Sequence, residues 1–402
     1  PRVLWRLAER AFARGDYAAA AAAYAQIPSA ALDPSLAPEV AFRWGASLAK
    51  AGRHAEAGER LEAFTRKFPS DPNVPTALHL LGLSAQQSGR LDAAVNALQE
   101  LADRFPKAEG REETLRRIAL LEGARGRPAA LRAAYARLVQ EFPKTRFLGE
   151  AAWWTGASWL DEKKFAEAIA PLERARALDP SAYAASATER LILAHYALRQ
   201  RIPLAQELLA PSAKTASPAP EIWEWAARRS AAEGDPAAAV ALYTKLLAHP
   251  AAGALRHPAR RALAASLAAR GEWKAAAENL EGYVAEAADP DDAIAGRLDL
   301  ARARRALKEF DRARELAEGV MTEQPEGRAN AEARMILGEI LDAQGKPGEA
   351  AKQWLGVALL YDDPQLAPDA LARAADAFAR AGNAQEAARL REELAAKYPA
   401  KP

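Results

Sequence analysis

The side chains that could carry chemistry are few and scattered along this chain. Cys is absent, which excludes disulfides, thiolate metal sites and thiol catalysis. The five His residues form no His-Glu-x-x-His set. His249 and His257 flank one loop and could in principle share a metal, but we interpret them as a solvated pair. Gly338 to Lys346 has the wrong spacing for a phosphate loop and lacks the hydroxyl residue. No cofactor or metal is predicted.

Paired carboxylates are the remaining catalytic possibility. The Asp pairs at 291–292 and 362–363 are expected at helix starts, where the helix dipole and the free N–H groups account for them. Glu332, Glu339 and Asp342 are the only loose candidates for an acid–base pair, which a hydrolase or carbohydrate-processing enzyme would need in a groove. We therefore predict that the chain is not an enzyme.

The composition indicates which elements must position these residues. A chain of 402 residues is too long for one compact core, so it forms several domains or one repeat array. Ala, Leu, Glu and Arg, which favour helices, are abundant, whereas the β-branched residues that favour strands are sparse. The sequence therefore predicts an all-α protein.

The charge and hydropathy patterns exclude two classes of partner. Lys plus Arg is 55 and Asp plus Glu is 53, so the formal net charge is only +2. The densest basic cluster, Arg302, Arg304 and Arg305, has acidic residues close by, and we expect a solvated helix face and no nucleic-acid partner. No stretch approaches the ~20 apolar residues that span a bilayer, so no direct membrane insertion is expected. No signal peptide is visible, and because the chain starts at Pro1 without Met we expect a processed or trimmed piece.

A short turn recurs along the whole chain. It occurs at eleven positions: 15, 52, 89, 126, 163, 200, 234, 271, 308, 345 and 382. We call these positions the turn slots. Eight of them hold Gly, and the other three hold Lys163, Gln200 and Lys308. Nine of the ten steps are 37 residues, and the step from 200 to 234 is 34. A fixed period of this length is typical of a repeat array.

Three further positions keep the same register. Gly or Ala lies seven residues before the turn in most repeats, as at Gly45, Gly82, Gly156 and Gly338. Ala lies five residues after the turn in ten of eleven cases: Ala20, Ala57, Ala94, Ala168, Ala205, Ala239, Ala276, Ala313, Ala350 and Ala387. Pro lies seventeen after it in six cases: Pro69, Pro106, Pro143, Pro180, Pro325 and Pro399. Small residues let two antiparallel helices approach closely, and Pro ends the second helix.

These signals predict a repeating unit of helix, tight turn, helix and loop. The turn Gly follows the first helix, where a left-handed conformation is least costly for Gly. Asp71, Asp179, Asp289 and Asp363 are expected to cap the helices that follow the loops. One helix pair cannot bury its own apolar face, so neighbouring pairs must stack.

At this point the chain resembles the tetratricopeptide repeat family. The skeleton of small residue, Gly, Ala and Pro appears as Gly45, Gly52, Ala57 and Pro69 in repeat two. The resemblance covers essentially the whole chain, although the period of 37 exceeds the family's usual 34. It implies a right-handed superhelical solenoid of about eleven helix-turn-helix repeats and a non-catalytic scaffold for protein–protein interaction.

A finer resemblance points to a compartment. The Phe-Pro and Tyr-Pro repeat ends, together with Ala-Trp-Trp-Thr-Gly at 152–156, look like bacterial cell-envelope members. These include the periplasmic Tol–Pal-associated coordinator and the outer-membrane assembly lipoprotein, both scaffolds. The resemblance implies a periplasmic or outer-membrane-associated location, with a cytoplasmic location as the alternative.

The short step divides the array. We predict an N-terminal array over 1–210 with repeats one to six and a C-terminal array over 221–402 with repeats seven to eleven. Between them, residues 211–220 read as a loop by composition. This loop is either a hinge or a slight irregularity in a continuous superhelix.

In this family the first helix of each pair lines the concave groove. Carried onto this sequence, the groove slots lie thirteen, ten, six, three and two residues before the turn, and a protein or peptide partner is expected there. The partner-binding residues predicted in this way are Trp5, Phe12, Phe42, His79, Leu83, Gln86, Gln87, Arg116, Trp153, Arg190, Glu224, Arg228, Arg302 and Arg305. Aromatic and Arg side chains are common interface anchors, and acidic groups of a partner could face Arg116 and Arg190.

Two alternatives to the groove scaffold stay open. Because neither end of the array looks like a polar capping helix, the chain could be a structural assembly module that forms homo-oligomers through its uncapped ends. A solenoid enzyme that uses Glu332, Glu339 and Asp342 is the less favoured alternative. For Trp153, core packing and groove exposure are both open, because Trp154 and Trp159 lie beside it on one expected helix.

Overall fold

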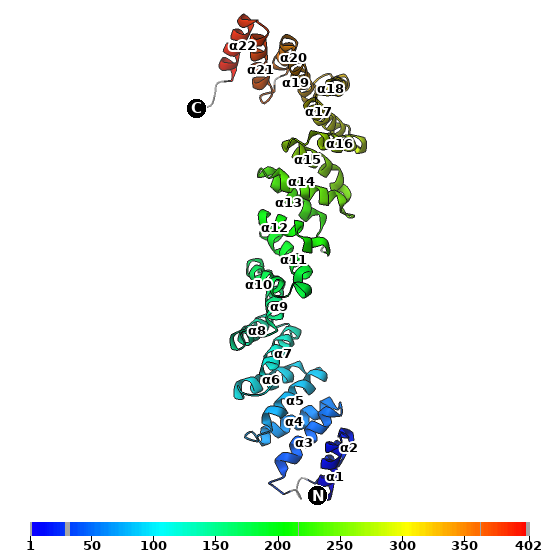
Figure 1. Ribbon diagram of the computed structural model, residues 1–402, viewed down its shortest axis with the longest axis vertical. Helices are drawn as coiled ribbons and strands as arrows, with labels where there is room; N and C mark the ends of the chain where they lie inside the picture. Colours follow the sequence, from blue (N-terminus) through cyan, green and yellow to red (C-terminus); the bar gives the residue numbers. More distant parts are fainter. Residues whose placement is uncertain (1, 29–32, 216, 362, 399–402) are drawn as a thin grey trace. The chain divides into compact units, whose positions relative to one another are not determined.

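The computed structural model describes residues 2–28, 33–215, 217–361 and 363–398. Some sequence predictions fall at Pro1, Ala216, Asp362, Pro399 and Pro402, which lie outside these ranges. Within them the chain forms 22 α-helices, with turns and short 3-10 segments between them and no strand. The prediction of an all-α protein built from eleven helix pairs is confirmed (Figure 1).

The chain divides into two compact units, residues 1–198 and 199–402. We call them unit 1 and unit 2. The helices of unit 1 are α1 (Arg2–Ala13), α2 (Tyr17–Ala25), α3 (Ala37–Lys50), α4 (His54–Lys67), α5 (Val74–Gln87), α6 (Leu91–Arg104), α7 (Arg111–Ala124), α8 (Pro128–Glu141), α9 (Leu148–Asp161), α10 (Phe165–Leu178) and α11 (Pro180–Ala197).

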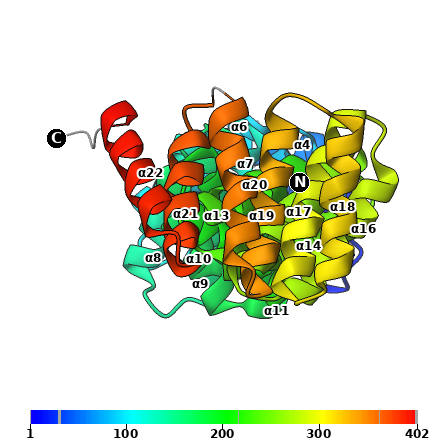
Figure 2. The same ribbon diagram turned by 90° about the horizontal axis from the view of Figure 1, so that it is seen from above.

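Unit 2 begins with the second helix of repeat six. Its helices are α12 (Arg201–Leu209), α13 (Pro220–Ala232), α14 (Pro236–Ala248), α15 (Arg256–Ala269), α16 (Trp273–Glu286), α17 (Pro290–Ala306), α18 (Phe310–Glu323), α19 (Arg328–Ala343), α20 (Pro347–Leu360), α21 (Ala367–Arg380) and α22 (Ala384–Lys397). Figure 2 shows α17 to α22 side by side, and each of these helices packs on the next. Odd-numbered helices are the first helices of the repeats, and even-numbered helices are the second.

The predicted hinge at 211–220 lies within unit 2. Residues Pro211–Thr215 form a short 3-10 helix after α12, and Ala213 is buried. Pro218, just before α13, is buried as well. A hinge at this loop stays a prediction.

The small residue before each turn explains how a helix pair closes. A Cβ at Gly45 would lie 2.8 Å from the side chain of Leu61, and one at Gly82 would lie 2.6 Å from that of Leu98. Leu61 and Leu98 are both fully buried. The first helix therefore presents bare backbone to a large side chain of the second, and close packing of this kind leaves no room for a methyl group.

The turns have the predicted left-handed backbone, with one correction. All eight slot glycines have positive φ, and so do Lys163 (φ 59) and Lys308 (φ 63). In repeat six the residue with positive φ is Arg199 (φ 55), whereas Gln200 is the N-cap of α12. The predicted slot there is wrong by one residue, because no Gly marks the left-handed position and spacing alone selected Gln200.

Asp179 and Asp289 are helix N-caps as predicted, whereas the N-caps of α5 and α21 are Asn73 and Leu366 instead of Asp71 and Asp363. The Asp179 carboxylate accepts a hydrogen bond from the backbone N–H of Ala182 (3.1 Å) at the start of α11. Asp289 accepts from the N–H of Asp291 (2.9 Å) at the start of α17. Asp71 and Asp363 accept backbone hydrogen bonds in the turns just before α5 and α21.

The core runs between stacked helix pairs. The Ala five residues after each turn is buried in all ten repeats that have it. Within each unit, second helices pack on neighbouring first helices on both sides, as α4 does on α3 and α5. Each repeat therefore depends on its neighbours for burial, as expected of a repeat array.

Candidate functional site

All predicted groove residues lie on first helices. They are distributed over unit 1 on α1 (Trp5, Phe12), α3 (Phe42), α5 (His79, Leu83, Gln86, Gln87), α7 (Arg116), α9 (Trp153) and α11 (Arg190), and over unit 2 on α13 (Glu224, Arg228) and α17 (Arg302, Arg305). Their contacts differ from one helix to the next, and contact with a partner stays a prediction for all of them.

The aromatic residues at the start of unit 1 pack within the array. Trp5 is half-buried against the core around α1 and α2. Phe12 lies edge-on to Tyr17, and the guanidinium of Arg43 lies 4.7 Å from its ring centroid. Phe42 packs on Phe64, with ring centroids 5.6 Å apart. All three side chains are half-buried, so only part of each ring is accessible to a partner.

The polar residues of α5 are only partly available. Burial, aided by the nearby Arg117, lowers the pKa of His79, so its ring is neutral at pH 7. Gln86 accepts a hydrogen bond from Arg117 (3.0 Å). Leu83 is half-buried, whereas Gln87 is exposed.

Arg116 already has carboxylate partners within the chain. Its Nε lies 2.9 Å from a carboxylate oxygen of Glu150 on α9, and its Nη1 donates to Glu113 (3.1 Å). The Tyr135 hydroxyl donates to the same Glu150 (2.8 Å). Burial and this carboxylate raise the pKa of Tyr135, so its hydroxyl stays a donor. An acidic partner at Arg116 would have to compete with Glu150.

Trp153 belongs to a stacked cluster. Its ring lies nearly parallel to that of Tyr183 on α11, with centroids 5.4 Å apart. The guanidinium of Arg190 lies 4.4 Å from the Trp153 centroid. The ring thus joins α9 to α11 through stacking and a cation–π contact.

In unit 2 the groove arginines form a chain of ion pairs across first helices. Arg261 on α15 binds Asp299 on α17 (2.7 Å), and Arg302 binds the same Asp299 (2.9 Å). Arg302 also binds Glu332 on α19 (3.0 Å). Arg328 then joins Glu332 (3.1 Å) to Asp363 (3.2 Å). Glu224 and Arg228 pair within α13 (3.0 Å).

A second row of pairs runs beside the first. Glu339 on α19 lies between Arg305 on α17 (3.1 Å) and Arg373 on α21 (2.9 Å). Arg380 on α21 pairs with Asp342 on α19 (2.6 Å). We call both rows together the ion-pair ladder. Arginines and carboxylates alternate along the ladder, so their charges largely neutralise one another on this face of unit 2.

The same ladder accounts for the candidate catalytic carboxylates. Glu332, Glu339 and Asp342 are each paired with one or two arginines rather than with one another. An acid–base mechanism needs two carboxylates that face a common reacting atom. The contacts seen here assign these three residues to helix packing.

The candidate metal pair has structural contacts instead. The His257 ring stacks on Tyr283, and its Nε2 lies 3.1 Å from the Tyr283 carbonyl oxygen. His249 Nδ1 accepts from the N–H of Ala251 (3.2 Å). In the part of the chain that the structure describes, no three His, Asp or Glu side chains gather as metal ligands would.

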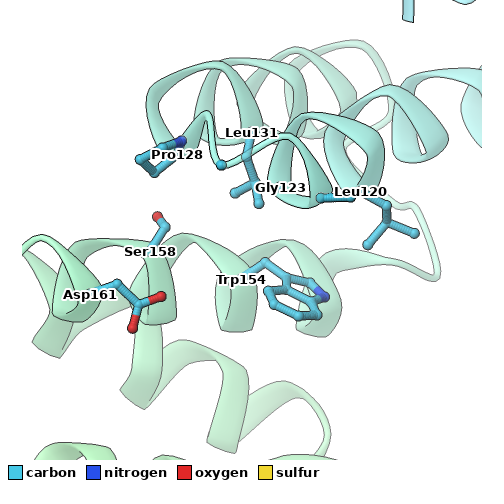
Figure 3. A pocket seen from close by; sticks show the side chains of 9 residues that line it. Leu120, Gly123, Pro128, Leu131, Trp154, Ser158 and Asp161 are labelled. Atoms are coloured by element: carbon cyan, nitrogen blue, oxygen red, sulfur yellow. The ribbon is translucent and has the colours of Figure 1, made fainter. Parts of the chain in front are cut away.

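An apolar cleft opens between α7 and α9. It encloses about 500 Å³ and is lined by Leu120, Gly123, Ala124, Gly126, Pro128, Leu131, Trp154, Ser158 and Asp161. We call this set the α7–α9 cleft. Figure 3 shows residues of α7 and α8 on one side and Trp154, Ser158 and Asp161 of α9 on the other.

Trp154 is the aromatic residue that lines the α7–α9 cleft. It is 41% exposed, which is unusual for Trp in a folded protein. The Ser158 hydroxyl is already satisfied, because it donates to the Thr155 carbonyl (2.8 Å) and accepts from Arg132 (3.0 Å). The cleft therefore offers apolar surface and one carboxylate, that of Asp161 at its edge.

The sequence pattern did not predict this cleft. It indicates Trp153 as a groove residue, which stays a prediction, whereas the neighbouring Trp154 lines the cleft. The signal was present in repeat four, where the slots six, three and two residues before the turn hold Leu120, Gly123 and Ala124. Ala124 is exposed there, whereas Leu131 occupies the place where a Cβ of Gly123 would lie.

Two segments of the chain match a known family model. Residues 42–109 and 297–366 match the family described as tetratricopeptide repeat. The helix pairs of these two segments are packed in the manner of tetratricopeptide repeats. One matched segment lies in each unit, and each covers most of two helix pairs. Tetratricopeptide arrays generally serve as non-catalytic scaffolds for protein–protein interaction.

Solved structures with tetratricopeptide repeats resemble the chain only at the level of fold. A putative kinesin light chain with TPR-like repeats from Podospora anserina is 25% identical over 44% of this chain and 92% of that one, with a TM-score of 0.38. A tetratricopeptide repeat protein from Parabacteroides merdae is 14% identical over 75% and 99%, with a TM-score of 0.29. The Cut9–Hcn1 hetero-tetramer of the APC/C is 12% identical over 98% and 86%, with a TM-score of 0.37.

No curated protein matches the chain. Among the described residues, no helix combines the length and the apolar character needed to cross a membrane.

Proposed function

We propose that this tetratricopeptide array is a non-catalytic scaffold that binds a partner protein on the first-helix face of unit 1. A large apolar side chain of the partner occupies the α7–α9 cleft and packs on the Trp154 indole. The observation that carries the proposal is the cleft itself, an apolar space of about 500 Å³ beside an exposed Trp. Trp side chains in such pockets are typical anchors of binding energy.

The ion pairs support unit 1 rather than unit 2 as the binding region. In unit 2 the predicted groove residues Arg302 and Arg305 are held by carboxylates of neighbouring helices. A partner there must displace those carboxylates, which costs part of the binding energy. The α7–α9 cleft requires no such exchange, because its walls are apolar.

The experiment is site-specific photocrosslinking in the native cell. A photoreactive residue replaces Ala124, which is exposed on the cleft wall. The matched control replaces Ala343, which lies two residues before the turn of repeat ten as Ala124 does in repeat four. We expect one partner protein to crosslink at position 124 and not at 343.

A second variant tests whether the cleft itself holds the partner. Trp154→Ala removes the exposed indole, and it replaces no fully buried residue. Ala124→Arg places a long side chain in the opening of the cleft. Both changes should abolish the crosslink and weaken capture of the same partner at least tenfold. If the partner is captured equally well by both variants, the site lies elsewhere and the proposal is wrong.

A second candidate function is self-assembly, and one observation favours it. Val3 and Leu7, one helical turn apart on α1, are 71% and 52% exposed. A second copy of the chain could cover this apolar face. Sedimentation equilibrium of the wild type and of Leu7→Glu tests the idea, since a concentration-independent monomer in both would exclude it.

We also propose a location in the bacterial envelope, either periplasmic or associated with the outer membrane. It rests on the Phe-Pro repeat ends and on the Ala-Trp-Trp-Thr-Gly segment at 152–156. Fractionation of cells that produce the native full-length protein tests it directly. Recovery with the soluble cytoplasmic proteins would exclude the proposal.

A further inference from the structure

The residue that follows the turn is basic in four successive repeats of unit 1 and acidic in three successive repeats of unit 2. In repeats two to five it is Arg53, Arg90, Arg127 and Lys164. In repeats seven, eight and nine it is Asp235, Glu272 and Glu309. Each of these residues is the N-cap of its second helix, so in unit 1 the four cations lie along one edge of the stacked pairs.

Between the turns of repeats three and four this edge is hollowed. A hollow of about 630 Å³ is lined by Gly89, Arg90, Leu91, Asp92, Ala93, Arg125 and Arg127. We call it the turn-edge hollow. Its lining carries three arginines and a single aspartate, so it is positively charged as a whole.

Two of the three arginines lack a carboxylate partner. Arg125 is neutralised by Asp92 (2.5 Å) and Glu122 (3.0 Å). Arg90 reaches only the Ser88 hydroxyl, at 3.5 Å, and its Nη2 is buried without an acceptor. Arg127 is exposed and makes no ion pair with any residue that the structure describes. Both side chains line the hollow, so an anion there would be attracted by two positive charges that no carboxylate of the described residues neutralises.

Arg90 is held at this place by a glycine of the preceding repeat. Gly58 lies inside α4, where Gly is less favourable for the helix than Ala. A Cβ at Gly58 would lie within 2 Å of the Arg90 guanidinium, so the missing side chain makes the room that Arg90 occupies. The packing therefore keeps this cation in place beside the turn-edge hollow.

We infer that the partner of this scaffold is an acidic protein segment whose carboxylates bind Arg90 and Arg127 in the turn-edge hollow. The inference rests on the proposed function in taking the partner to be a protein, and it adds the partner's charge. The hollow adjoins the α7–α9 cleft, because Gly126 and Pro128 line the cleft while Arg127 between them lines the hollow. One segment can therefore place an apolar side chain in the cleft and acidic residues on the turn edge.

The same observations disfavour a nucleic acid. Binding of single strands combines cations with aromatic side chains on which bases stack, and no aromatic residue lines the turn-edge hollow. Carboxylates also interrupt the basic row, since Glu56 pairs with Arg53 (2.6 Å) and Asp92 lines the hollow itself. A continuous polyanion would meet these carboxylates, whereas a peptide can place neutral residues opposite them.

The test measures binding of a fluorescent oligo-glutamate peptide to the whole chain by anisotropy. The variant is Arg90→Ser with Arg127→Ser, chosen because Ser is a favoured N-cap residue and keeps α6 and α8 intact. The matched control is Lys346→Ser, which changes the same N-cap position in repeat ten. Circular dichroism and thermal melting check that all variants remain folded.

We expect the double variant to bind oligo-glutamate at least tenfold more weakly than wild type, and Lys346→Ser to bind as wild type does. Binding should also weaken as salt is added, since charged surfaces are screened. Absence of oligo-glutamate binding, or equal binding by the double variant, overturns the inference. Tighter binding of single-stranded DNA or of phosphatidylserine vesicles with the same dependence on Arg90 and Arg127 also overturns it, because the partner would then not be a protein.

The outcomes separate this inference from the proposed function. If Trp154→Ala leaves partner capture unchanged while the arginine variant loses oligo-glutamate binding, the cleft proposal fails and the acidic-ligand site stands. If Trp154→Ala abolishes partner capture while the arginine variant binds oligo-glutamate as wild type does, the cleft proposal stands and the acidic-ligand site fails.

Discussion

At the residue scale, glycines within helices have distinct roles in this chain. Leu98 occupies the place where a Cβ of Gly82 in α5 would lie. The Arg90 guanidinium occupies the corresponding place at Gly58 in α4. Gly319 in α18 has no neighbouring atom within 4 Å of the place where a Cβ would be. The same residue type is therefore required by packing at two positions and by nothing in the structure at the third.

The contrast gives a prediction for a matched pair of substitutions. Gly82→Ala should destabilise the protein by about 1–3 kcal/mol, because the new methyl group overpacks the buried Leu98. Gly319→Ala should stabilise it by up to about 1 kcal/mol, because Ala favours the helix and nothing obstructs it. Urea unfolding of both variants checks the signs, and stabilisation by Gly82→Ala would contradict the packing argument.

At the scale of elements, neighbouring first helices are joined by stacked rings and by ion pairs, and Arg116 with Glu150 forms such an ion pair in unit 1. In unit 1 the contacts between α9 and α11 include the stacked rings of Trp153 and Tyr183. In unit 2 the ion-pair ladder joins α15, α17, α19 and α21. Ion pairs respond to charge removal and to salt, whereas apolar and stacking contacts respond little.

The ladder predicts that one neutral substitution loosens several helices. Glu339→Gln leaves Arg305 and Arg373 without their shared carboxylate, and the Glu339 side chain is only 20% exposed. We expect a loss of about 1–2 kcal/mol, with faster amide exchange in α17, α19 and α21.

A control pair at the surface should behave differently. Glu393→Gln breaks the pair with Lys397 in α22, where the lysine side chain is 59% exposed. Exposed pairs within one helix contribute about 0.3–0.5 kcal/mol, so its effect on stability should be small. Equal losses in Glu339→Gln and Glu393→Gln would show that the ladder adds no stability.

At the scale of the whole molecule, stability is a sum over neighbouring repeats, and carboxylates contribute to it in both units. Hydrogen bonds from Arg111, assisted by Arg137, hold the pKa of Glu141 in unit 1 below its usual value. A hydrogen bond from Arg297 does the same to the pKa of Glu323 in unit 2. Each pair joins the first helix of one repeat to its second helix, α7 to α8 and α17 to α18, so protonation weakens the contact within that helix pair.

This gives a prediction for acid. Because the folded pKa of both carboxyls lies below the unfolded value of about 4.3, their contribution is fully present above that pH. It is lost as the pH falls through the folded pKa, so the melting temperature should drop as acid is added below about pH 4. Thermal melts from neutral to acid pH measure this, and Arg111→Met should flatten the part of the drop that Glu141 causes. An unchanged profile in Arg111→Met would show that this pair does not couple folding to pH.

The sequence by itself determined the fold class, the repeat boundaries and the turns. It could do so because each depends on local chemistry, such as Gly at a left-handed turn or Ala at a helix contact. The error at Gln200 arose where that local signal was missing, since any residue can be forced into a left-handed turn by its neighbours.

Only the tertiary structure decided which surface is available to a partner. Arg116, Arg302 and Arg305 could be predicted as anchors, but their carboxylate partners lie about one repeat away in sequence and meet them only through stacking. The α7–α9 cleft and the turn-edge hollow are likewise spaces between repeats, whose walls come from separate helix pairs. Period and composition describe one repeat, whereas pairing of charges and open volume depend on how two repeats pack together.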